Sequence, residues 1–540
     1  MVKEIQSKRP GQDDLAGIRN RINKLAQAYK PHSLKIMIAV VFAGFGSFFI
    51  YQSFAANANL PGDINNDNKV NLTDLSQLLS KWNTTDSNSD VNADGKVNLQ
   101  DLSILLSNWN KTYTPGTPPT TPPTTPPTTP PTNGGFAGPL KVGPSNRNLV
   151  DANGKPFFFT ADTCWSCLTT LSVADAKKHI DLRKAQGFNV IMTNVVFFSR
   201  NASGPHGSPF TNGNLAQPKE EYFKAIDEIV DYADTQNMVM YIGTLWTGDN
   251  GGKFGGTLPS MSEFETYGTW IANRYKSKDN IVWFVGGDDS PGRNFSQITA
   301  MANKMKAASP NQLISHHNDS KYPAASTQGW LGFTSFQWNS NDSPYSYSLV
   351  RDALGWANKP AWDMEPPYDP LTCCGNDRDT SEQENRRAGW WAALSGAMGV
   401  AYGGPRASWY MGGENGNKLD TNAINRNGAR HTGIIQKIMT PLNWQLLQPD
   451  WNNETVTGGR GSYGSSNYVA AARASDGSLI MAYTPQGATL TVNLSKLSGS
   501  ATAQWYNVTT GDPIGSPENV SNSGTKTFST GTDSVLIIKR

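Results

Sequence analysis

Between residue 140 and about residue 445, apolar runs alternate with amphipathic stretches. Eight of the runs are short and rich in β-branched and aromatic residues, which predicts strands. They span residues 156–163, 188–197, 238–246, 280–288, 312–319, 333–340, 360–366 and 399–404. The intervening stretches, such as 173–186 and 219–236, carry apolar residues at helical spacing, least clearly after the fifth strand. This alternation predicts a (β/α)₈ TIM barrel over residues 136–445.

The last part of the chain, residues 446–540, has a different period. Alternating apolar and polar residues in "ATLTVNLS" and "SVLIIKR", together with turn pairs such as "SDGS", predict a C-terminal β-sandwich.

A polar pattern is duplicated near the N-terminus, in "DINNDNKVNLTD" (63–74) and "DVNADGKVNLQD" (90–101). Each copy places oxygen-bearing residues at loop positions 1, 3, 5, 9 and 12, with a backbone carbonyl for position 7, as a calcium ion requires. The candidate ligands are Asp63, Asn65, Asp67, Lys69, Asn71, Asp74, Asp90, Asn92, Asp94, Lys96, Asn98 and Asp101. We therefore expect two Ca²⁺ ions in residues 59–112, one in each loop.

Two further features of each repeat support a calcium-binding loop. Each loop leads into a short amphipathic helix, and position 6 is Asn68 or Gly95, both of which tolerate a left-handed turn. The alternative is an Asp/Asn-rich surface loop, but duplication with matching helices disfavours it.

Residues 113–135 repeat Thr-Pro-Pro, which favours an extended polyproline helix over a packed core. At about 3.1 Å per residue, the twenty residues from Thr114 form a semi-rigid spacer of roughly 60 Å.

The first 58 residues resemble a targeting segment. Eight Lys or Arg residues precede the apolar stretch 36–54, and a small-x-small site follows at 56–58. These features predict an export signal peptide, although the 19 apolar residues also approach the length of an uncleaved membrane anchor. Both alternatives place the rest of the chain outside the cytoplasm, either secreted or at the cell surface.

Composition narrows the function further. A net charge of +2 argues against a broad nucleic-acid-binding surface. Sixteen Trp, 18 Tyr and 51 Gly with 17% charged residues are typical of exported carbohydrate-active proteins. Cys164, Cys167, Cys373 and Cys374 follow the first and seventh strands, so we expect disulfides that tie these loops together; the pairing is open.

The candidate chemistry lies at the C-terminal strand ends, which form the active-site face of such barrels. We expect Trp165, Trp246 and Trp338 to stack on a sugar ring, and polar neighbours to hydrogen-bond its hydroxyls. The full substrate-binding set is Asp162, Trp165, Asn194, Trp246, His316, His317, Gln337, Trp338 and Tyr402.

Two carboxylates stand out at opposite strands. Asp288 ends the fourth strand after two glycines, and Glu365 ends the seventh before two prolines. Glycoside hydrolysis needs such a pair, about 5–5.5 Å apart when the anomeric configuration is retained. Asp289 and Asp363 are rivals; Asp363, two residues before Glu365, should face the same side but lie deeper, with Met364 pointing away.

Several segments carry family resemblances. "FFFTADTCW", "GFNVIMTNVV", "NIVWFVGGD", "KPAWDMEP" and "RRAGWWAALSGAMGVAYG" resemble the apiosidase-like glycoside hydrolases (family 140), and the C-terminal segment resembles their appended collagen-binding-type domain. The resemblance implies that Asp288 is the acid/base and Glu365 the nucleophile, with no cofactor for catalysis. The family's Asp-Gly-Glu-Pro reads Asp-Met-Glu-Pro here.

The duplicated loop and helix resemble the dockerin type I module, over residues 59–112. This implies calcium-dependent folding and docking to a cohesin-bearing scaffold. The recognition pairs Leu72-Thr73 and Leu99-Gln100 differ from the usual Ser/Thr pairs, which leaves the cohesin unspecified.

Two functions compete. One is an exported glycosidase that trims side chains of plant cell-wall, pectin-type polysaccharides. The other is a non-catalytic glycan- or matrix-binding adhesin on the same scaffold. The intact carboxylate pair favours the enzyme, and hydrolysis of aryl glycosides separates the two.

Overall fold

The structure is a computed structural model in which the chain forms two compact units, Met1–Pro130 and Pro131–Arg540. It describes residues 62–65, 67–86, 88–91, 96–98, 101–102, 104–105, 108–109, 136–197, 199–201, 203–248, 257–289, 294–318, 325–337, 346–369, 380–410 and 418–540. Among these residues, no helix combines the length and apolarity needed to cross a bilayer. The expected targeting segment and the Thr-Pro-Pro spacer lie outside the described residues.

In the first unit, helix α3 (Leu72–Ser80) follows the first loop. Asn71 caps it, and Asp74 returns the hydrogen bond in a capping box. The two repeats join through a short backbone pair, Asn83 N to Val97 O (2.9 Å) and Val97 N to Thr84 O (2.8 Å). Their shared core contains Ile64, Val70, Leu78, Val97 and Leu105. Leu78 of α3 and Leu105 of the second repeat therefore share one core, whereas Leu79 is 52% exposed.

The second unit begins with a small antiparallel sheet of β1 (Lys141–Val142), β2 (Leu149–Val150) and β3 (Pro156–Phe157). Eight parallel strands follow: β4 (Phe159–Thr163), β5 (Val190–Asn194), β6 (Val239–Trp246), β7 (Ile281–Asp289), β8 (Ile314–Asn318), β9 (Thr334–Gln337), β10 (Ala361–Glu365) and β11 (Gly399–Tyr402). Their order is β11-β4-β5-β6-β7-β8, with β10-β9 paired separately. All eight predicted strands are confirmed.

The parallel sheet curls around one aromatic core. Phe159 lies 4.8 Å from Trp362 and 5.6 Å from Tyr241, although these rings belong to β4, β10 and β6. Backbone hydrogen bonds also join the six-stranded group to the β10-β9 pair on both sides. Gly332 N, just before β9, donates to Ile314 O of β8 (2.7 Å), and Met398 N, just before β11, donates to Ala361 O of β10 (2.9 Å).

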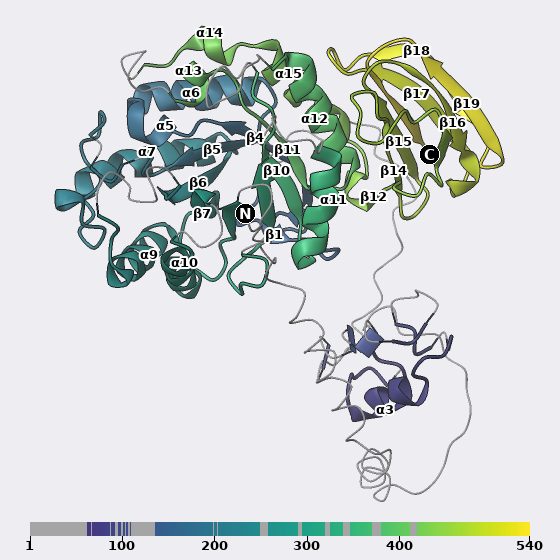
Figure 1. Cartoon of the computed structure of the whole chain (residues 1–540), viewed down its shortest axis with the longest axis horizontal. Coiled ribbons are helices and arrows are strands. Elements are labelled where there is room, and N and C mark those ends of the chain that lie inside the picture. Colours follow the sequence, from purple (N-terminus) through teal and green to yellow (C-terminus); the bar gives the residue numbers. More distant parts are fainter. Residues whose placement is uncertain are drawn as a thin grey trace, which may run out of the picture. The chain divides into compact units, whose positions relative to one another are not determined.

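Helices cover the outer face of the sheet (Figure 1). The longer ones are α6 (Val173–Ala185), α7 (Glu220–Thr235), α9 (Met261–Tyr275), α10 (Phe295–Ala308), α11 (Ser346–Ala357), α12 (Glu382–Leu394) and α15 (Asn427–Met439). Short helices are α5 (Cys167–Thr170), α13 (Arg406–Trp409) and α14 (Thr421–Ile424). The helices predicted at 173–186 and 219–236 are confirmed. Between β8 and β9, the described residues 325–333 contain no helix.

The C-terminal part is a two-sheet β domain, in agreement with the predicted β-rich period. One sheet has the order β12 (Leu447–Pro449), β14 (Ala470–Ala474), β15 (Leu479–Thr484), β20 (Ser534–Lys539), β17 (Ala501–Asn507), β18 (Pro513–Val520). The other contains β13 (Val456–Gly458), β16 (Ala488–Asn493) and β19 (Thr525–Thr530). Residues of both sheets, such as Ile480 and Val492, share one core.

This β domain packs against α11 and α12 (Figure 1). Trp390 stacks on Tyr483 with ring centroids 5.7 Å apart, and Trp391 donates its indole N–H to the Tyr468 carbonyl at 2.9 Å. A partly buried ion pair, Arg386 to Asp533 at 2.6 Å, adds a polar contact. Because the contact is aromatic and extensive, the two domains form one packed body.

Candidate active site

The end of β7 has an unusual backbone. Gly286, Gly287 and Asp288 have φ values of 94°, 145° and 32°, a region that L-residues rarely occupy. A Cβ on Gly287 would lie 2.8 Å from the Trp246 indole, so only glycine fits there. The pairing with β8 also shifts between Gly286 and Asp289. The two glycines therefore let the strand turn and point Asp288 away from the regular pleat.

His317 lies between the two predicted catalytic carboxylates. Its Nε2 is 3.2 Å from Glu365 Oε1, 3.8 Å from Asp288 Oδ1 and 3.0 Å from Gln337 Oε1. All three neighbours are acceptors, so Nε2 carries the proton and donates it. The His317 side chain is fully buried, whereas Glu365 is 19% and Asp288 44% exposed. The carboxylates thus face solvent above a buried donor.

The charges of this cluster act on one another. Burial disfavours a charged imidazole, but the hydrogen bond to Glu365 and the charges of Glu365 and Asp288 outweigh it and raise the pKa of His317 to about 9. His317 is therefore an imidazolium at neutral pH. One oxygen of Asp288, one of Glu365 and a His317 nitrogen lie within 4.8 Å of one another, which is also metal-site spacing.

Aromatic rings pack against His317. Trp165 stacks on His317, with centroids 5.3 Å apart and an interplanar angle of 15°. Its indole N–H donates to Tyr368 Oη at 2.9 Å, and Trp246 packs edge-on against both Trp165 and His317. Trp165 and Trp246 are only 2% and 4% exposed. The predicted role of these two tryptophans as open sugar platforms is therefore wrong; they hold His317 in place.

Two other predicted ligands point outward. Asp162 is fully buried and pairs with Arg183 (2.7 Å) and His179 (2.8 Å) on α6. Tyr402 is also buried and packs its ring against Arg183 at 5.3 Å. Side chains alternate along a strand, and both residues have the parity that faces the helices. Their assignment to the substrate site is wrong, and strand parity could have shown this.

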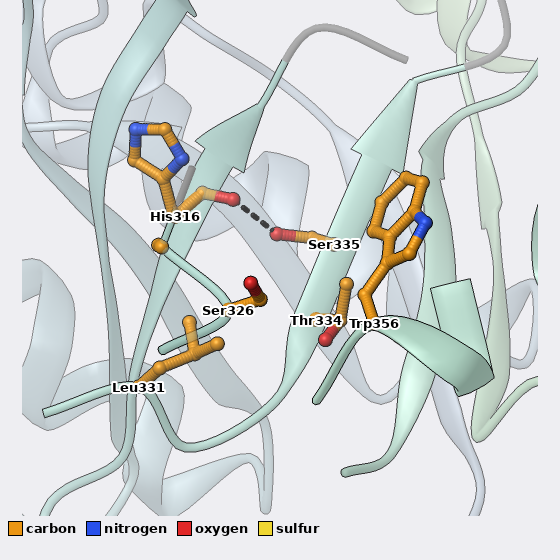
Figure 2. A pocket seen from close by; sticks show the side chains of 7 residues that line it. His316, Ser326, Leu331, Thr334, Ser335 and Trp356 are labelled. Carbon is orange, nitrogen blue, oxygen red and sulfur yellow. Dashed lines mark hydrogen bonds between the residues drawn. The ribbon is translucent and has the colours of Figure 1, made fainter. Parts of the chain in front are cut away.

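Alternation along β8 also places the side chains of the adjacent His316 and His317 on opposite faces of the sheet. His316 faces the helix layer, 5.6 Å from the Phe295 ring, and borders a small cavity with Leu331, Thr334 and Trp356 (Figure 2). Burial and the neighbouring His317 lower its pKa to about 3, so it is neutral. The prediction that His316 binds substrate is wrong, whereas His317 lies in the site.

Asn194 and Asp363 also differ from expectation. Asn194 is fully buried, and its amide donates to the Trp165 carbonyl at 3.3 Å, so it fixes the turn after β4 rather than lining a pocket. Trp362 and Met364 both lie in the inner core, which leaves Asp363 on the outer parity. A register shift between Asp363 and Glu365 brings Glu365 back to the site. The expectations that Asp363 faces the site and that Met364 points away are wrong.

Gln337 is half-buried beside His317, so its contact with substrate stays a prediction. Trp338 lies outside the described residues, as do Cys373 and Cys374. Cys164 and Cys167 form a disulfide with each other. It closes the turn that carries Trp165 and does not tie two loops together, contrary to our expectation.

The first N-terminal loop has the shape of a cation site. Asp74 is buried, and its carboxylate accepts backbone N–H groups of Ile64 (2.8 Å), Asn65 (3.2 Å) and Asn71 (2.9 Å). Burial raises the pKa of Asp74, and the charge of Asp63 adds to this. A cation held between these two carboxylates would relieve both effects, so the residues fit Ca²⁺.

The second loop repeats this geometry where it is described. Asn98 N donates to Asp101 Oδ2 at 2.7 Å, as Asn71 N does to Asp74 in the first loop. Asp90 and Asp101 are buried, whereas Asn92 and Asp94 lie outside the described residues. In the first loop, Asn68 has a φ of 66°, as expected for position 6.

Comparisons with known families agree with this geometry. The model of the family described as "Apiosidase-like, catalytic domain" matches residues 144–445, more than half of the chain. The chain belongs to the apiosidase-like family. It is therefore a glycosidase, as predicted. Outside this apiosidase-like domain, residues 61–109 match the dockerin type I domain and residues 455–539 match the "Putative collagen-binding domain of a collagenase".

Solved structures resemble the apiosidase-like and C-terminal domains together. A structure titled "Glycoside hydrolase" has a TM-score of 0.65 at 23% identity and covers 74% of this chain and 97% of its own. A glycoside hydrolase family 5 protein from Bacteroides vulgatus has a TM-score of 0.65 at 21% identity, with coverages of 75% and 95%. At these identities the likeness shows the fold. A comparison with curated proteins finds no match.

One member of the apiosidase-like site was not expected from the sequence. Tyr368, three residues after Glu365, is buried and accepts the Trp165 hydrogen bond. Burial and the charge of Glu365 hold the pKa of Tyr368 well above its ordinary value, so it stays neutral. Only the curl of the sheet shows that this residue reaches the turn after β4.

Proposed function

We propose that the chain is an exported, retaining glycosidase that removes side chains from plant cell-wall, pectin-type polysaccharides, with Glu365 as nucleophile and Asp288 as general acid/base. The observation that carries the proposal is the His317-centred cluster, whose carboxylate oxygens lie within 4.8 Å of each other. This proximity favours the retaining geometry over the inverting one, which leaves about 6.5–9.5 Å for a water molecule.

The chemistry follows from the two environments. Asp288 protonates the leaving oxygen while Glu365 attacks the anomeric carbon, so the C–O bond to the leaving group breaks and a glycosyl ester forms. Water then gives a proton to Asp288 and attacks the same carbon, releasing Glu365. Asp288 is the more exposed carboxylate, at 44%, and exchanges protons with leaving group and water.

His317 supports the nucleophile in this scheme. Its 3.2 Å contact with Glu365 Oε1 fixes the position of the carboxylate that attacks. His317 is a positioning residue, because the stacked Trp165 and the contact with Gln337 fix its ring.

We extend the proposal to the whole chain. Backbone contacts on both sides of the β10-β9 pair support a closed (β/α)₈ barrel over residues 136–445, with a β-sandwich over 446–540. The match to dockerin type I supports one Ca²⁺ in each N-terminal loop and docking to a cohesin-bearing scaffold. Such a partner places the enzyme outside the cell, secreted or surface-attached.

Proton NMR of hydrolysis tests the catalytic part. A panel of aryl glycosides that includes apiosides identifies the accepted sugar, and the first anomer released reports the stereochemistry. We expect the retained anomer to appear before mutarotation. An inverted first product would contradict the roles given to Glu365 and Asp288. Binding of glycans without turnover of any aryl glycoside would favour the adhesin.

A further inference from the structure

A second cavity lies where the C-terminal β domain meets helix α11. Its volume is about 300 Å³, which is within the range of small-ligand sites. It is lined by Arg351 of α11 and by Trp451, Asn453, Arg460, Tyr463 and Tyr468 of the β domain. None of these residues belongs to the carboxylate site, so the cavity has no part in the proposed reaction.

The floor of the cavity is rigid. Arg460 is 8% exposed, and its guanidinium donates to Asn453 Oδ1 (2.8 Å) and Tyr468 Oη (2.8 Å). It also pairs with Asp450 at 3.2 Å, whose carboxylate accepts three backbone N–H groups of residues 454–456. A ligand would therefore meet walls that are already ordered, which lowers the entropic cost of binding.

One wall offers an open aromatic ring. Tyr463 is 57% exposed and is the only exposed aromatic side chain in the described part of the chain. It contacts Tyr347 and Tyr468 edge-on, with centroids 4.9 Å and 5.4 Å away. Gly464 N donates to Tyr347 Oη at 2.7 Å, which ties this loop to α11. Such a ring, apolar on its face and fixed by its neighbours, suits the C–H face of a sugar.

The other wall carries an unmatched positive charge. The exposed Arg351 guanidinium lies 5.3 Å from the centre of the Trp451 ring, and within the described residues no carboxylate lies at ion-pair distance from it. The charge of Arg460, in contrast, is balanced by Asp450. A guanidinium held in place by an indole is suited to a carboxylate, which it binds in a bidentate manner.

We propose that this cavity is a second glycan-binding site, specific for uronic-acid units of an acidic polysaccharide. The carboxylate of the sugar pairs with Arg351, its ring packs on Tyr463, and a hydroxyl accepts from the Asn453 amide, whose oxygen is already bonded to Arg460. The site binds without cleaving, so it does not depend on the proposed hydrolytic function.

Calorimetric titration of the full chain with tetragalacturonate tests this site, with the fully methyl-esterified tetramer as a matched neutral ligand. We expect Arg351→Gln to weaken binding of the acidic tetramer about tenfold, and of the ester far less. Arg540 is an exposed arginine outside the cavity, so Arg540→Gln is the control and should leave the affinities for both tetramers unchanged. Tyr463→Ala should weaken both ligands, whereas Tyr463→Phe keeps the ring and should bind normally.

Equal binding of tetragalacturonate by the wild-type chain, Arg351→Gln and Tyr463→Ala would overturn the proposal. So would Tyr463-dependent binding of a Thr-Pro-Pro peptide (residues 117–131) without uronate binding, because the cavity would then be a polyproline groove. Turnover of aryl glycosides should stay within about twofold in both variants, since neither residue touches the active site. Uronate binding without any turnover would contradict the proposed hydrolysis and leave this site standing.

Discussion

The carboxylates of the apiosidase-like domain and those of the N-terminal repeats are kept close together by different means. At the candidate active site, the imidazolium of His317 lies between Glu365 and Asp288 and offsets one of their two negative charges. In the first N-terminal loop, the contacts of Asp74 are backbone N–H groups, and its pKa is raised by burial and by Asp63. The first cluster contains a cationic side chain among its carboxylates, whereas the contacts of Asp74 in the second are all backbone N–H groups. The difference shows that carboxylate spacing alone does not predict a metal site.

Removing a catalytic carboxylate should have the largest effect. We expect Glu365→Gln to reduce kcat at least roughly 10³-fold, because no nucleophile remains. Asp288→Asn should reduce kcat less than this on aryl glycosides with good leaving groups, because such leaving groups need little protonation. Steady-state kinetics measure both. Asp352→Asn, on the exposed face of α11, is the matched control. A Glu365→Gln enzyme with nearly normal kcat would remove Glu365 from the reaction.

Chelation should affect the N-terminal carboxylate cluster and not the cluster around His317. EDTA should unfold the N-terminal module and leave aryl glycoside turnover unchanged, because the proposed reaction uses Asp288 and Glu365 without a metal. Titration of Ca²⁺ into the chelator-treated full chain should show two bound ions, and Asp74→Ala should remove one. Loss of turnover on chelation, restored by metal, would instead assign a metal to Asp288, His317 and Glu365.

The pH profile tests His317. Its folded pKa of about 9 lies above the unfolded value of 6.5, so its contribution is fully present below pH 6.5 and disappears as pH rises through 9. The shift corresponds to on the order of 3 kcal/mol. We expect kcat/KM and Tm to decline over this window in the wild-type enzyme.

The neighbouring histidine supplies the control for that profile. His317→Gln should lower kcat/KM and lose the alkaline decline, whereas His316→Gln should keep it, because His316 is neutral throughout. An identical alkaline decline in His317→Gln would show that another group titrates.

Glycine substitutions give the smallest expected effects. Gly287→Ala places a Cβ 2.8 Å from Trp246 at a φ of 145°, so we expect a loss of about 1–3 kcal/mol in unfolding free energy and a lower kcat. Gly355→Ala, inside α11 with no atom within 4 Å, should stabilise the chain by up to about 1 kcal/mol. Thermal melts and kcat of the two variants compare them directly. Equal melting temperatures for Gly287→Ala and the wild-type chain would show that the turn after β7 carries no strain.

Several features were accessible from the sequence because they depend on short segments. Hydrophobic period located all eight parallel strands and the C-terminal β domain, and the spacing of oxygen ligands located the loops at 63–74 and 90–101. The pairing of Asp288 with Glu365 followed from their places at strand ends. Alternation along a strand could also have excluded Asp162, His316 and Tyr402, since each has the outer parity.

Other features required the folded chain. The bulge that returns Glu365 to the site, the stack of Trp165 under His317 and the reach of Tyr368 all join residues far apart in sequence. The cavity at Arg351 and Tyr463 exists only because the β domain packs on α11.

The sequence by itself therefore determined the strands, the repeats and the strand-end positions of Asp288 and Glu365, because period and spacing are local properties of the chain. The tertiary structure decided which strand-end residues meet, and that His317 lies between the two carboxylates. The reason is physical: the protonation of His317 depends on charges from β7 and β10 that the curled sheet brings within 4 Å of its ring nitrogen.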